Sequence, residues 1–438
     1  MSSDSNPLIV AERLGASIGG KLGEIAFQEM ELSYVSSTLP HFSENPLIRM
    51  RQHLDLYWDA SYLKTTLVDE FCKCLPSTIP ILNITSNSPE MLFGSINDSD
   101  MIVYPAFLNV RIAKITELAS FVSGRNMQDI VNTMNKIMEG EWVTRQLLKF
   151  GRRELSEAEI QKAEAKGIVY DPERAQLSYQ PSTTIFACSR PLDNRTYTHL
   201  KTSGHLYRYH VIQKEITDEE AKQYLTSYHK PDITLYAKLR QINEKINALS
   251  IKAIDLPDQH ITDDIFGHLF SFVENEVQDR NVRLATILDL RTKGDILREL
   301  AAVAVIRTIH ENDFNDIEKI EYDAKDVDFI KADIGHFVEA KIHPLFVEDF
   351  SKPNPLKQRQ MRPVKELIQS FLLDGNERTR QEIVTYVLSK MTVSLATIDN
   401  ALKEMLASDA IAAGSKFGAY RTREVNANHA RARINHGH

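Results

Sequence analysis

The segment from Arg51 to Leu75 constrains the fold of this chain more than any other stretch. Its residue pattern predicts a short apolar strand, His53 to Tyr57, then a loop and an amphipathic helix that begins at Lys64. Backbone N–H groups at a helix N-terminus bind phosphate when a lysine ammonium lies beside them, and a hydroxyl at the next position can reach Mg²⁺. The order strand, loop, lysine and helix is therefore typical of a phosphate-binding loop. The candidate nucleotide-binding residues are Asp59, Ala60, Ser61, Lys64, Thr65 and Thr66.

The glycines that such a loop normally carries are replaced in this chain. The usual pattern is G-x-x-x-x-G-K-[ST], and Trp58 and Leu63 occupy the two glycine positions. Glycine allows a positive φ and a close approach of phosphate, and larger side chains oppose both. An ordinary strand-to-helix turn with a surface lysine is therefore the alternative interpretation of this segment.

Composition places the chain among folded proteins of more than one domain. Its 438 residues are enough for two or three domains, and 42% hydrophobic with 26% charged residues is a globular rather than a disordered composition. Cys72, Cys74 and Cys188 are too few for a disulfide framework and lack the second pair of a zinc site, so we expect buried free thiols and assign no metal ligands. Neither a signal peptide nor an apolar run long enough to cross a membrane is found, which predicts a cytoplasmic protein without a membrane partner.

The order of the predicted elements indicates an α/β protein with separate parts. Strands and helices alternate between residues 44 and 216, which favours a mainly parallel sheet flanked by helices. Residues 1–16 are expected to be irregular, and one amphipathic helix is predicted between Ser17 and Ser43. The predicted parts are an N-terminal segment (1–43), an α/β core (44–216), a helical lid region (217–350), a linker (351–356), a winged-helix domain (357–425) and a basic tail (426–438).

Within the core, apolar runs and turn residues predict individual elements. The predicted strands are Ile79 to Asn83, Met101 to Tyr104, Thr183 to Cys188 and Val211 to Glu215. The predicted helices are Val110 to Ser123 and Asn126 to Glu139, with a strand pair from Trp142 to Lys149 and an exposed helical insertion from Glu154 to Gly167.

The C-terminal part combines a basic charge with the pattern of a winged helix. Residues 352–438 carry a formal charge of +6, whereas residues 1–351 carry −14. Three helices, the second starting with a capping box at Thr379 and Glu382, precede a strand, glycine turn and strand. Such a fold lays its third helix along the DNA major groove and uses wing cations on phosphate, although many winged helices dock proteins instead. The candidate DNA contacts are Arg378, Arg380, Thr397, Asn400, Lys416, Arg421 and Arg423.

Five segments in order resemble the AAA+ core of archaeal and eukaryotic minichromosome-maintenance (MCM) helicases. They are "LYWDASYLKTTLV" at the Walker A loop, "MIVYPAFLNV" at the Walker B strand, "NTMNKIMEGEWVTRQLLKFG" at a helix and β-hairpin, "TTIFACSRP" at the sensor 1 strand, and "GHLYRYHVI" at the arginine-finger segment. The resemblance runs from about Leu39 to Phe350. It implies a P-loop NTPase core with a helical lid and a C-terminal winged helix-turn-helix domain.

The resemblance also implies roles for individual residues. Arg208 takes the place of the finger that reaches a neighbouring subunit's nucleotide. Sensor-like positions fall on Ser189, Arg190 and, at the lid, Arg298 or Arg291, and the DNA-facing hairpin carries Arg145 and Lys149. The Walker B acids are replaced by Pro105 and Ala106, so binding of ATP and Mg²⁺ is expected to be weak or lost.

Three functions remain open at this stage. The first is an MCM-like ATPase or helicase of DNA replication, and the second is a pseudo-ATPase scaffold that holds DNA through its winged helix. The third is a DNA-binding regulator that oligomerises through its α/β body. The expected partners are duplex DNA and either further copies of the chain in a ring or an active AAA+ homologue. The nucleotide hypotheses assume that the strand Met101 to Tyr104 lies beside the strand that precedes Lys64 in one sheet.

Overall fold

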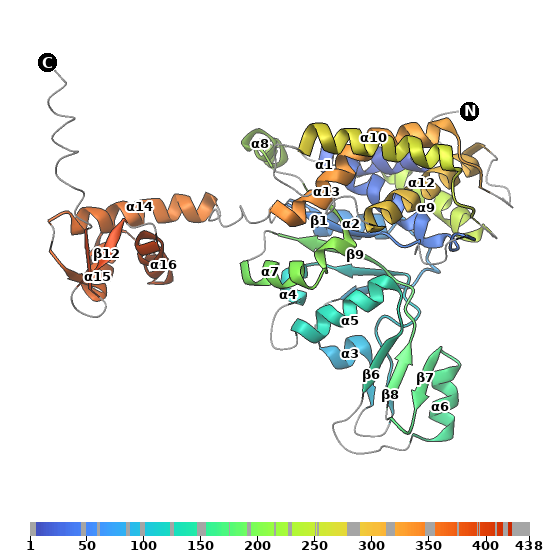
Figure 1. Cartoon of the computed structure of the whole chain (residues 1–438), viewed down its shortest axis with the longest axis horizontal. Helices are drawn as coiled ribbons and strands as arrows, with labels where there is room; N and C mark the ends of the chain where they lie inside the picture. Colours follow the sequence, from blue (N-terminus) through green and yellow to red (C-terminus); the bar gives the residue numbers. More distant parts are fainter. Residues whose placement is uncertain are drawn as a thin grey trace. The chain divides into compact units, whose positions relative to one another are not determined.

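A computed structural model of the chain describes residues 6–44, 50–58, 62–84, 88–96, 101–122, 127–146, 155–174, 176–190, 194–213, 216–226, 230–249, 251, 254–277, 290–311, 320–346, 355–374, 376–391, 393, 395–407, 410–414 and 419–422 (Figure 1). The chain divides into two compact units, Met1–Val347 (unit 1) and Glu348–His438 (unit 2). No helix within these ranges is at once long and apolar enough to cross a bilayer.

A parallel sheet forms the centre of unit 1. Within the described residues it has five strands in the order β10-β1-β9-β5-β2, and each pair of neighbours is parallel. Its strands are β10 (Tyr209–Gln213), β1 (His53–Tyr57), β9 (Thr184–Ser189), β5 (Ile112–Ile115) and β2 (Ile81–Ile84). All residues of β1 and β9 are buried, as in a sheet with both faces covered. The predicted α/β class with a parallel sheet is therefore confirmed.

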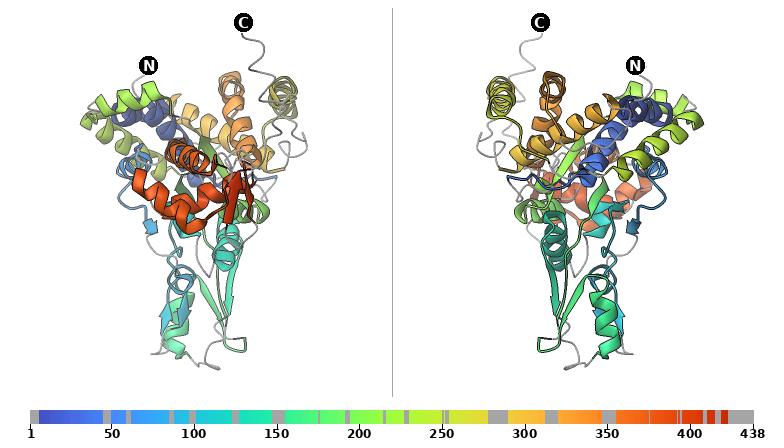
Figure 2. Two further views of the ribbon diagram at one scale, coloured as in Figure 1. Left: turned by 90° about the vertical axis from the view of Figure 1, so that its left-hand side faces the viewer. Right: turned by 90° about the vertical axis from the view of Figure 1, so that its right-hand side faces the viewer.

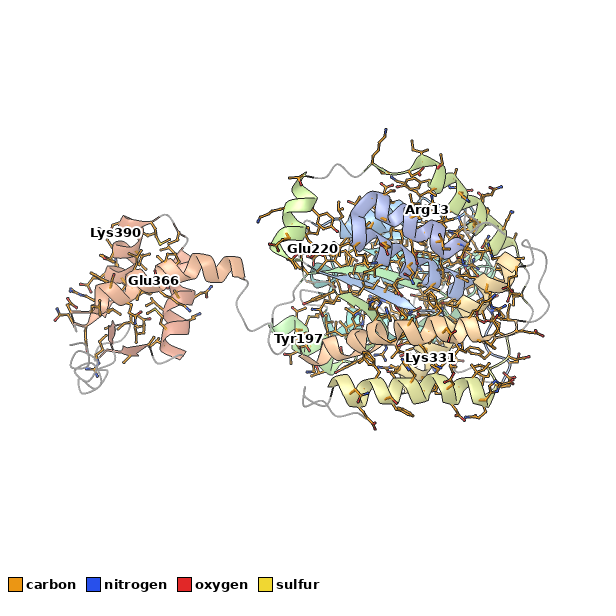
Figure 3. The ribbon with its side chains drawn as sticks, turned by 90° about the horizontal axis from the view of Figure 1, so that it is seen from above. Arg13, Tyr197, Glu220, Lys331, Glu366 and Lys390 are labelled. Carbon is orange, nitrogen blue, oxygen red and sulfur yellow. The ribbon has the colours of Figure 1, made fainter. Side chains whose placement is uncertain are left out.

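Helices cover one face of this sheet and bury a continuous hydrophobic core. The core joins Leu54 and Leu56 of β1 and Phe186 of β9 to apolar residues of all the helices on that face. In the view from above in Figure 3, α13 lies between the strands and α10, and Lys331 of α13 pairs with Asp264 of α10 at 2.6 Å. These helices are α1 (Pro7–Thr38), α2 (Lys64–Cys72), α9 (Ile233–Ala248), α10 (Gln259–Val277), α12 (Leu290–Glu311) and α13 (Ala324–Phe346), with α8 (Asp218–Thr226) beside α1.

The N-terminal helix is longer than predicted and sharply bent. It begins at Pro7, so residues 7–16, expected to be irregular, are helical. The bend lies at Gly19 and Gly20, and Gly20 has φ 56°, which favours glycine. The bend brings Gly15 and Gly23 together so closely that a Cβ on either would lie 2.0 Å from the other's carbonyl oxygen. The helix that was predicted as one is therefore two helical segments that pack against each other at Gly15 and Gly23.

The other face of the sheet carries shorter helices and an extended arm. The helices are α4 (Leu118–Phe121), α5 (Met127–Glu139) and α7 (Asn194–Thr202). The arm is an antiparallel sheet of β6 (Val143–Gln146), β8 (Gln176–Tyr179) and β7 (Ile168–Asp171) with α6 (Glu157–Glu164), and it extends away from the parallel sheet (Figures 1 and 2). The strand predicted from Trp142 thus pairs with β8, about thirty residues further along, rather than within one short segment.

Two predictions about the core segments are wrong. Residues 102 and 103 form β4 (Ile102–Val103), which pairs antiparallel with β3 (Ser95–Ile96) after α3 (Pro89–Phe93) and lies outside the parallel sheet. The segment Val110 to Ser123, predicted as a helix, instead contains β5 and the short α4. The strand that follows β2 into the parallel sheet is therefore β5, and the assumed position of Met101 to Tyr104 is wrong.

Unit 2 consists, in its described part, of three helices and a three-stranded antiparallel sheet. The elements are α14 (Pro355–Leu372), β11 (Arg378–Thr379), α15 (Arg380–Lys390), α16 (Leu395–Ala407), β12 (Ile411–Ala413) and β13 (Ala419–Thr422), and the strand order is β11-β13-β12. Val364, Ile368 and Leu372 are buried in its core, and Thr379 and Glu382 form the predicted capping box. Pro355 and Leu356, predicted as linker, begin α14, and residues 351–354 and 426–438 lie outside the described ranges.

The glycine contact in α1 predicts opposite effects for the same substitution at two sites. Gly15→Ala should lower the melting temperature of unit 1 by about 5 °C or more, because the new methyl group would overlap the Gly23 carbonyl. Gly267 is at an exposed position of α10, and a Cβ added there would meet no described atom within 4 Å. Gly267→Ala should therefore leave the melting temperature unchanged or raise it slightly. Thermal unfolding followed by circular dichroism measures both. Equal melting temperatures for the two variants would show that the glycine contact is not tight.

Candidate phosphate-binding site

The parallel register aligns the carboxyl ends of three strands at one edge of the sheet. Tyr57, the last residue of β1, pairs with Ser189, the last residue of β9, and Ile115 of β5 pairs with Ala187. The residues that follow these strands, Trp58, Arg190 and Glu117, therefore emerge at the same edge, which we call the phosphate edge. Ligands of open α/β sheets bind at the carboxyl ends of the strands.

Lys64 holds the candidate phosphate loop closed at this edge. It is the first residue of α2, is 9% exposed, and its Nζ donates a hydrogen bond to the carbonyl oxygen of Trp58 at 2.6 Å. The Trp58 indole Nε1 donates to the carbonyl oxygen of Tyr62 at 2.7 Å, so both ends of the loop are joined. Thr65 and Thr66 are exposed in the first turn of α2, whereas Asp59, Ala60 and Ser61 lie outside the described residues.

Leu63 adopts the backbone conformation that the usual glycine would supply. Its φ is 58° and its ψ 0°, in the left-handed region, immediately before α2. Such a conformation is rare for a branched side chain and stores strain of about 1 kcal/mol or more. The chain thus keeps a left-handed residue immediately before α2, although the glycine is lost.

Asp55 is a buried acid in the middle of β1, close to the loop. It is 1% exposed, and burial raises its pKa to about 7, while the positive charge of Lys64 acts in the opposite direction. Cys188, in the neighbouring strand, also has its pKa raised, to about 12, by burial first and by Asp55 second. A buried carboxyl group and a lysine therefore interact across the base of the loop.

Glu117 is the acid at the phosphate edge that sequence analysis missed. It follows β5 after Thr116, and its Oε2 lies 3.6 Å from Nε of Arg190. Its other oxygen, Oε1, is buried and has no hydrogen-bond partner in the part of the chain that the structure describes. Lys114 of β5 pairs with Asp69 of α2 at 2.5 Å, which fixes β5 against the helix that begins at Lys64. The run Ile112 to Ile115, with isoleucine at both ends and an acid shortly after it, was the available signal for a strand ending here.

The sensor-like residues divide between the two edges of the sheet. Ser189 is buried at the end of β9, and Arg190, which follows it, is exposed at the phosphate edge. Arg298 pairs with Asp295 of the same helix, and burial lowers its pKa to about 10. Its charge is among those that lower the pKa of His53, the first residue of β1. Arg298 therefore lies near the amino end of β1, away from Lys64.

Arg208 also lies at the amino edge, and within this chain it is held by an acid. It ends the 3-10 helix Leu206–Arg208 that leads into β10, whose first residue pairs with His53. Its Nε lies 2.9 Å from Oε1 of Glu139, and Arg291 contacts the same oxygen at 3.4 Å. A strand of five residues spans roughly 15 Å, so Arg208 cannot reach the phosphate edge of its own chain.

Some of the candidate DNA-binding side chains already form hydrogen bonds or ion pairs within the protein, and others are exposed. Arg145 of β6 donates to the carbonyl oxygen of Pro89 at 2.5 Å and lies 3.5 Å from Glu90, which attaches the arm to α3. In unit 2, both carboxylate oxygens of Asp399 accept hydrogen bonds from Arg380, at 2.6 and 2.7 Å, and Arg378 pairs with Asp374. Asn400 and Arg421 are exposed and Thr397 is half-buried, whereas Lys149, Lys416 and Arg423 lie outside the described residues.

Asp55 predicts a stability that depends on pH in a defined direction. A carboxyl group whose pKa is raised by folding stabilises the protein while protonated, and this contribution falls as pH rises from about 4 to about 7. Asp55→Asn should therefore be more stable than the wild type at pH 8, on the order of 2 kcal/mol, and the difference should shrink at pH 5. Urea unfolding at the two pH values measures it.

Glu31→Gln is the matched control for Asp55. Glu31 is buried on α1, its pKa is raised to about 8 by burial, and Asn243 donates to it at 3.3 Å. Its substitution should reproduce the pH-dependent gain in stability without touching the phosphate edge. A stability difference for Asp55→Asn that stays constant with pH would contradict the shifted pKa.

Comparison with known proteins adds no family assignment to this geometry. No protein-family model matches the chain, and no curated protein sequence matches it significantly.

Proposed function

We propose that unit 1 is an AAA+ module of the MCM type that binds a nucleoside triphosphate at the phosphate edge, and that unit 2 is a winged helix that contacts DNA. The observation that carries the proposal is the position of Lys64. It begins the helix that follows β1, a strand with parallel neighbours on both sides, and it lies next to a residue with a left-handed backbone, Leu63. These are the features of a phosphate-binding loop.

The sheet order supports an AAA+ core rather than another α/β fold. The loop-bearing strand β1 lies between β9 and β10, and β9 separates it from β5, which Thr116 and the acid Glu117 follow. In the AAA+ arrangement the sensor strand likewise lies between the Walker A and Walker B strands. The antiparallel arm is inserted between α5 and β9, the place where the resemblance to MCM helicases calls for a hairpin. Both features are consistent with the family expectation.

Phosphoryl transfer at this edge would use few groups. The amides of α2 and the Lys64 ammonium would neutralise phosphate charge, and the Thr65 hydroxyl would hold Mg²⁺. Glu117 has the position of the acid that orients the attacking water, and Arg190 contacts its carboxylate. Thr116 stands where a second acid would assist the metal. Loss of one such group costs on the order of 10² to 10³ in rate, so we infer that hydrolysis is slow.

Self-association is part of the proposal because of where Arg208 lies. It is at the edge of the sheet opposite Lys64, so it serves a nucleotide only if a second copy presents its phosphate edge to it. Arg208 is paired with Glu139 at 2.9 Å. In an assembly the guanidinium would either leave this carboxylate or contact phosphate through its remaining N–H groups.

The exposed surface of unit 2 supports a DNA contact that uses a small number of basic side chains. The exposed face of α16 carries Asn400 and Lys403, and β13 presents Arg421. Asp399 on the same helix neutralises Arg380 through two hydrogen bonds. We therefore assign the phosphate contact to Lys403 and Arg421 rather than to Arg380, and base-edge contact to Asn400 with Thr397.

Nucleotide binding tests the first part of the proposal. The affinity for a fluorescent ATP analogue should fall at least tenfold in Lys64→Ala and remain unchanged in Lys73→Ala, a lysine at the other end of α2 that pairs with Glu70. Glu117→Gln should bind the analogue but abolish any phosphate release. Equal affinity in wild type and Lys64→Ala would refute the phosphate loop, and binding without turnover in the wild type would identify a pseudo-ATPase.

DNA binding tests the second part. The double substitution of Lys403 and Arg421 by glutamate should weaken duplex binding about tenfold and reduce the slope of log affinity against log salt. Lys390→Glu changes a lysine at the end of α15 (Figure 3) in the same unit and should have a smaller effect. Fluorescence anisotropy with a labelled duplex at two salt concentrations measures both. No change in the double variant would favour a protein-docking role for unit 2.

A further inference from the structure

Three buried carboxylates meet inside unit 1, away from the phosphate edge. Glu29 of α1, Glu299 of α12 and Asp333 of α13 offer oxygen atoms that all lie within 4.8 Å of one another. Their exposures are 2%, 0% and 8%. We call these residues the carboxylate cluster. They join three helices that are distant in sequence, and nothing in the nucleotide proposal uses them.

Burying three carboxylates together is costly unless their charge is neutralised. An ionised carboxylate moved from water into a protein interior loses several kcal/mol of hydration. Burial raises the pKa of Glu29 and of Glu299 well above the ordinary value, and neighbouring carboxylates raise both further. His210 lies 3.7 Å from Glu29 and His336 lies 2.9 Å from Asp333, and a histidine balances charge only when it is protonated. The cluster therefore calls for a positive ion or for shared protons.

Oxygen atoms without partners point to an ion. Within the cluster, Glu29 Oε2, Glu299 Oε1 and Asp333 Oδ2 are buried and accept no hydrogen bond from an N–H or O–H donor among the described residues, although Glu299 and Asp333 lie close enough to share a proton. Gln52, which precedes β1 and is 2% exposed, places its amide at the cluster, with Nε2 3.5 Å from Glu299 Oε2. Its carbonyl oxygen Oε1 is also buried and has no hydrogen-bond partner within the described ranges. Gln52 thus adds, beside the carboxylates, an amide group whose oxygen has no hydrogen-bond partner among the described residues, and a proton shared among the acids would not give it one.

We propose that the carboxylate cluster and Gln52 bind a divalent cation that ties α1, α12 and α13 to the start of β1. Oxygen donors select hard cations such as Ca²⁺, Mg²⁺ and Mn²⁺, whereas Zn²⁺ prefers nitrogen and sulfur. Two oxygens on opposite sides of Ca²⁺ at about 2.4 Å are about 4.8 Å apart, and the oxygens of the cluster all lie within 4.8 Å of one another, so all three can reach one ion. Three carboxylates also supply more than enough negative charge for a 2+ ion. The role of the ion is structural, since Lys64 lies at the other end of β1.

Manganese binding tests the site directly. The loss of the free Mn²⁺ signal in electron paramagnetic resonance should show one ion per chain for the chelator-treated wild type in the absence of nucleotide. Lys64→Ala should bind the ion equally, which separates this site from the phosphate edge. Glu299→Gln should lose the binding, whereas Glu311→Gln, an exposed position of the same helix, should retain it. Asp333→Asn repeats the test if Glu299→Gln does not fold.

Stability provides a second measurement. Adding Ca²⁺ or Mn²⁺ should raise the melting temperature of the wild type by several degrees and leave Glu299→Gln unchanged. The proposal is overturned if the wild type binds no Mn²⁺, or if Glu299→Gln binds it as well as the wild type. A metal-insensitive protein that Glu299→Gln stabilises increasingly as pH rises would identify a proton-sharing cluster instead.

Discussion

The parallel pairing of β1 with β9 on one side and β10 on the other is the interaction on which the rest of unit 1 depends. A strand with parallel neighbours on both sides is covered by helices on both faces, because parallel connections must cross over the sheet. The five residues of β1 are accordingly all buried. The same pairing fixes the two edges of the sheet, with Lys64 and Glu117 at one and Arg208 at the other. The proposed nucleotide contact and the proposed self-association contact therefore lie at opposite edges of the sheet.

Local patterns predicted most helices and the parallel character of the sheet. The periodicity of Val364, Ile368 and Leu372 and the capping box at Thr379 identify elements through neighbours in the sequence, and the structure confirms them. The bend of α1 was not predicted, although glycines at 15, 19, 20 and 23 were visible. A helix pattern reports which face is apolar and does not report that two glycines of one helix will meet.

The acid at the phosphate edge was missed because β5 is only four residues long. Periodicity over four residues does not distinguish a buried strand from a helix, so Val110 to Ser123 was assigned to the wrong class and Glu117 to no site. Contacts between residues that are distant in the sequence could not be predicted from the sequence pattern either. Arg380 and Asp399 are 19 residues apart, and Glu29, Glu299 and Asp333 come from three helices. Tertiary packing decides such contacts, and the resemblance to MCM helicases stays a hypothesis for experiment.

Trp58, which closes the phosphate loop, gives unit 1 an internal optical probe. The chain has two tryptophans. Trp58 is 2% exposed and has the Lys64 ammonium 5.7 Å from the centre of its ring, whereas Trp142 is 51% exposed at the base of the arm. A soluble quencher such as iodide would quench the fluorescence of the exposed Trp142, whereas the fluorescence of the buried Trp58 would remain. That remaining emission would follow opening of the loop directly, without any label attached to the protein.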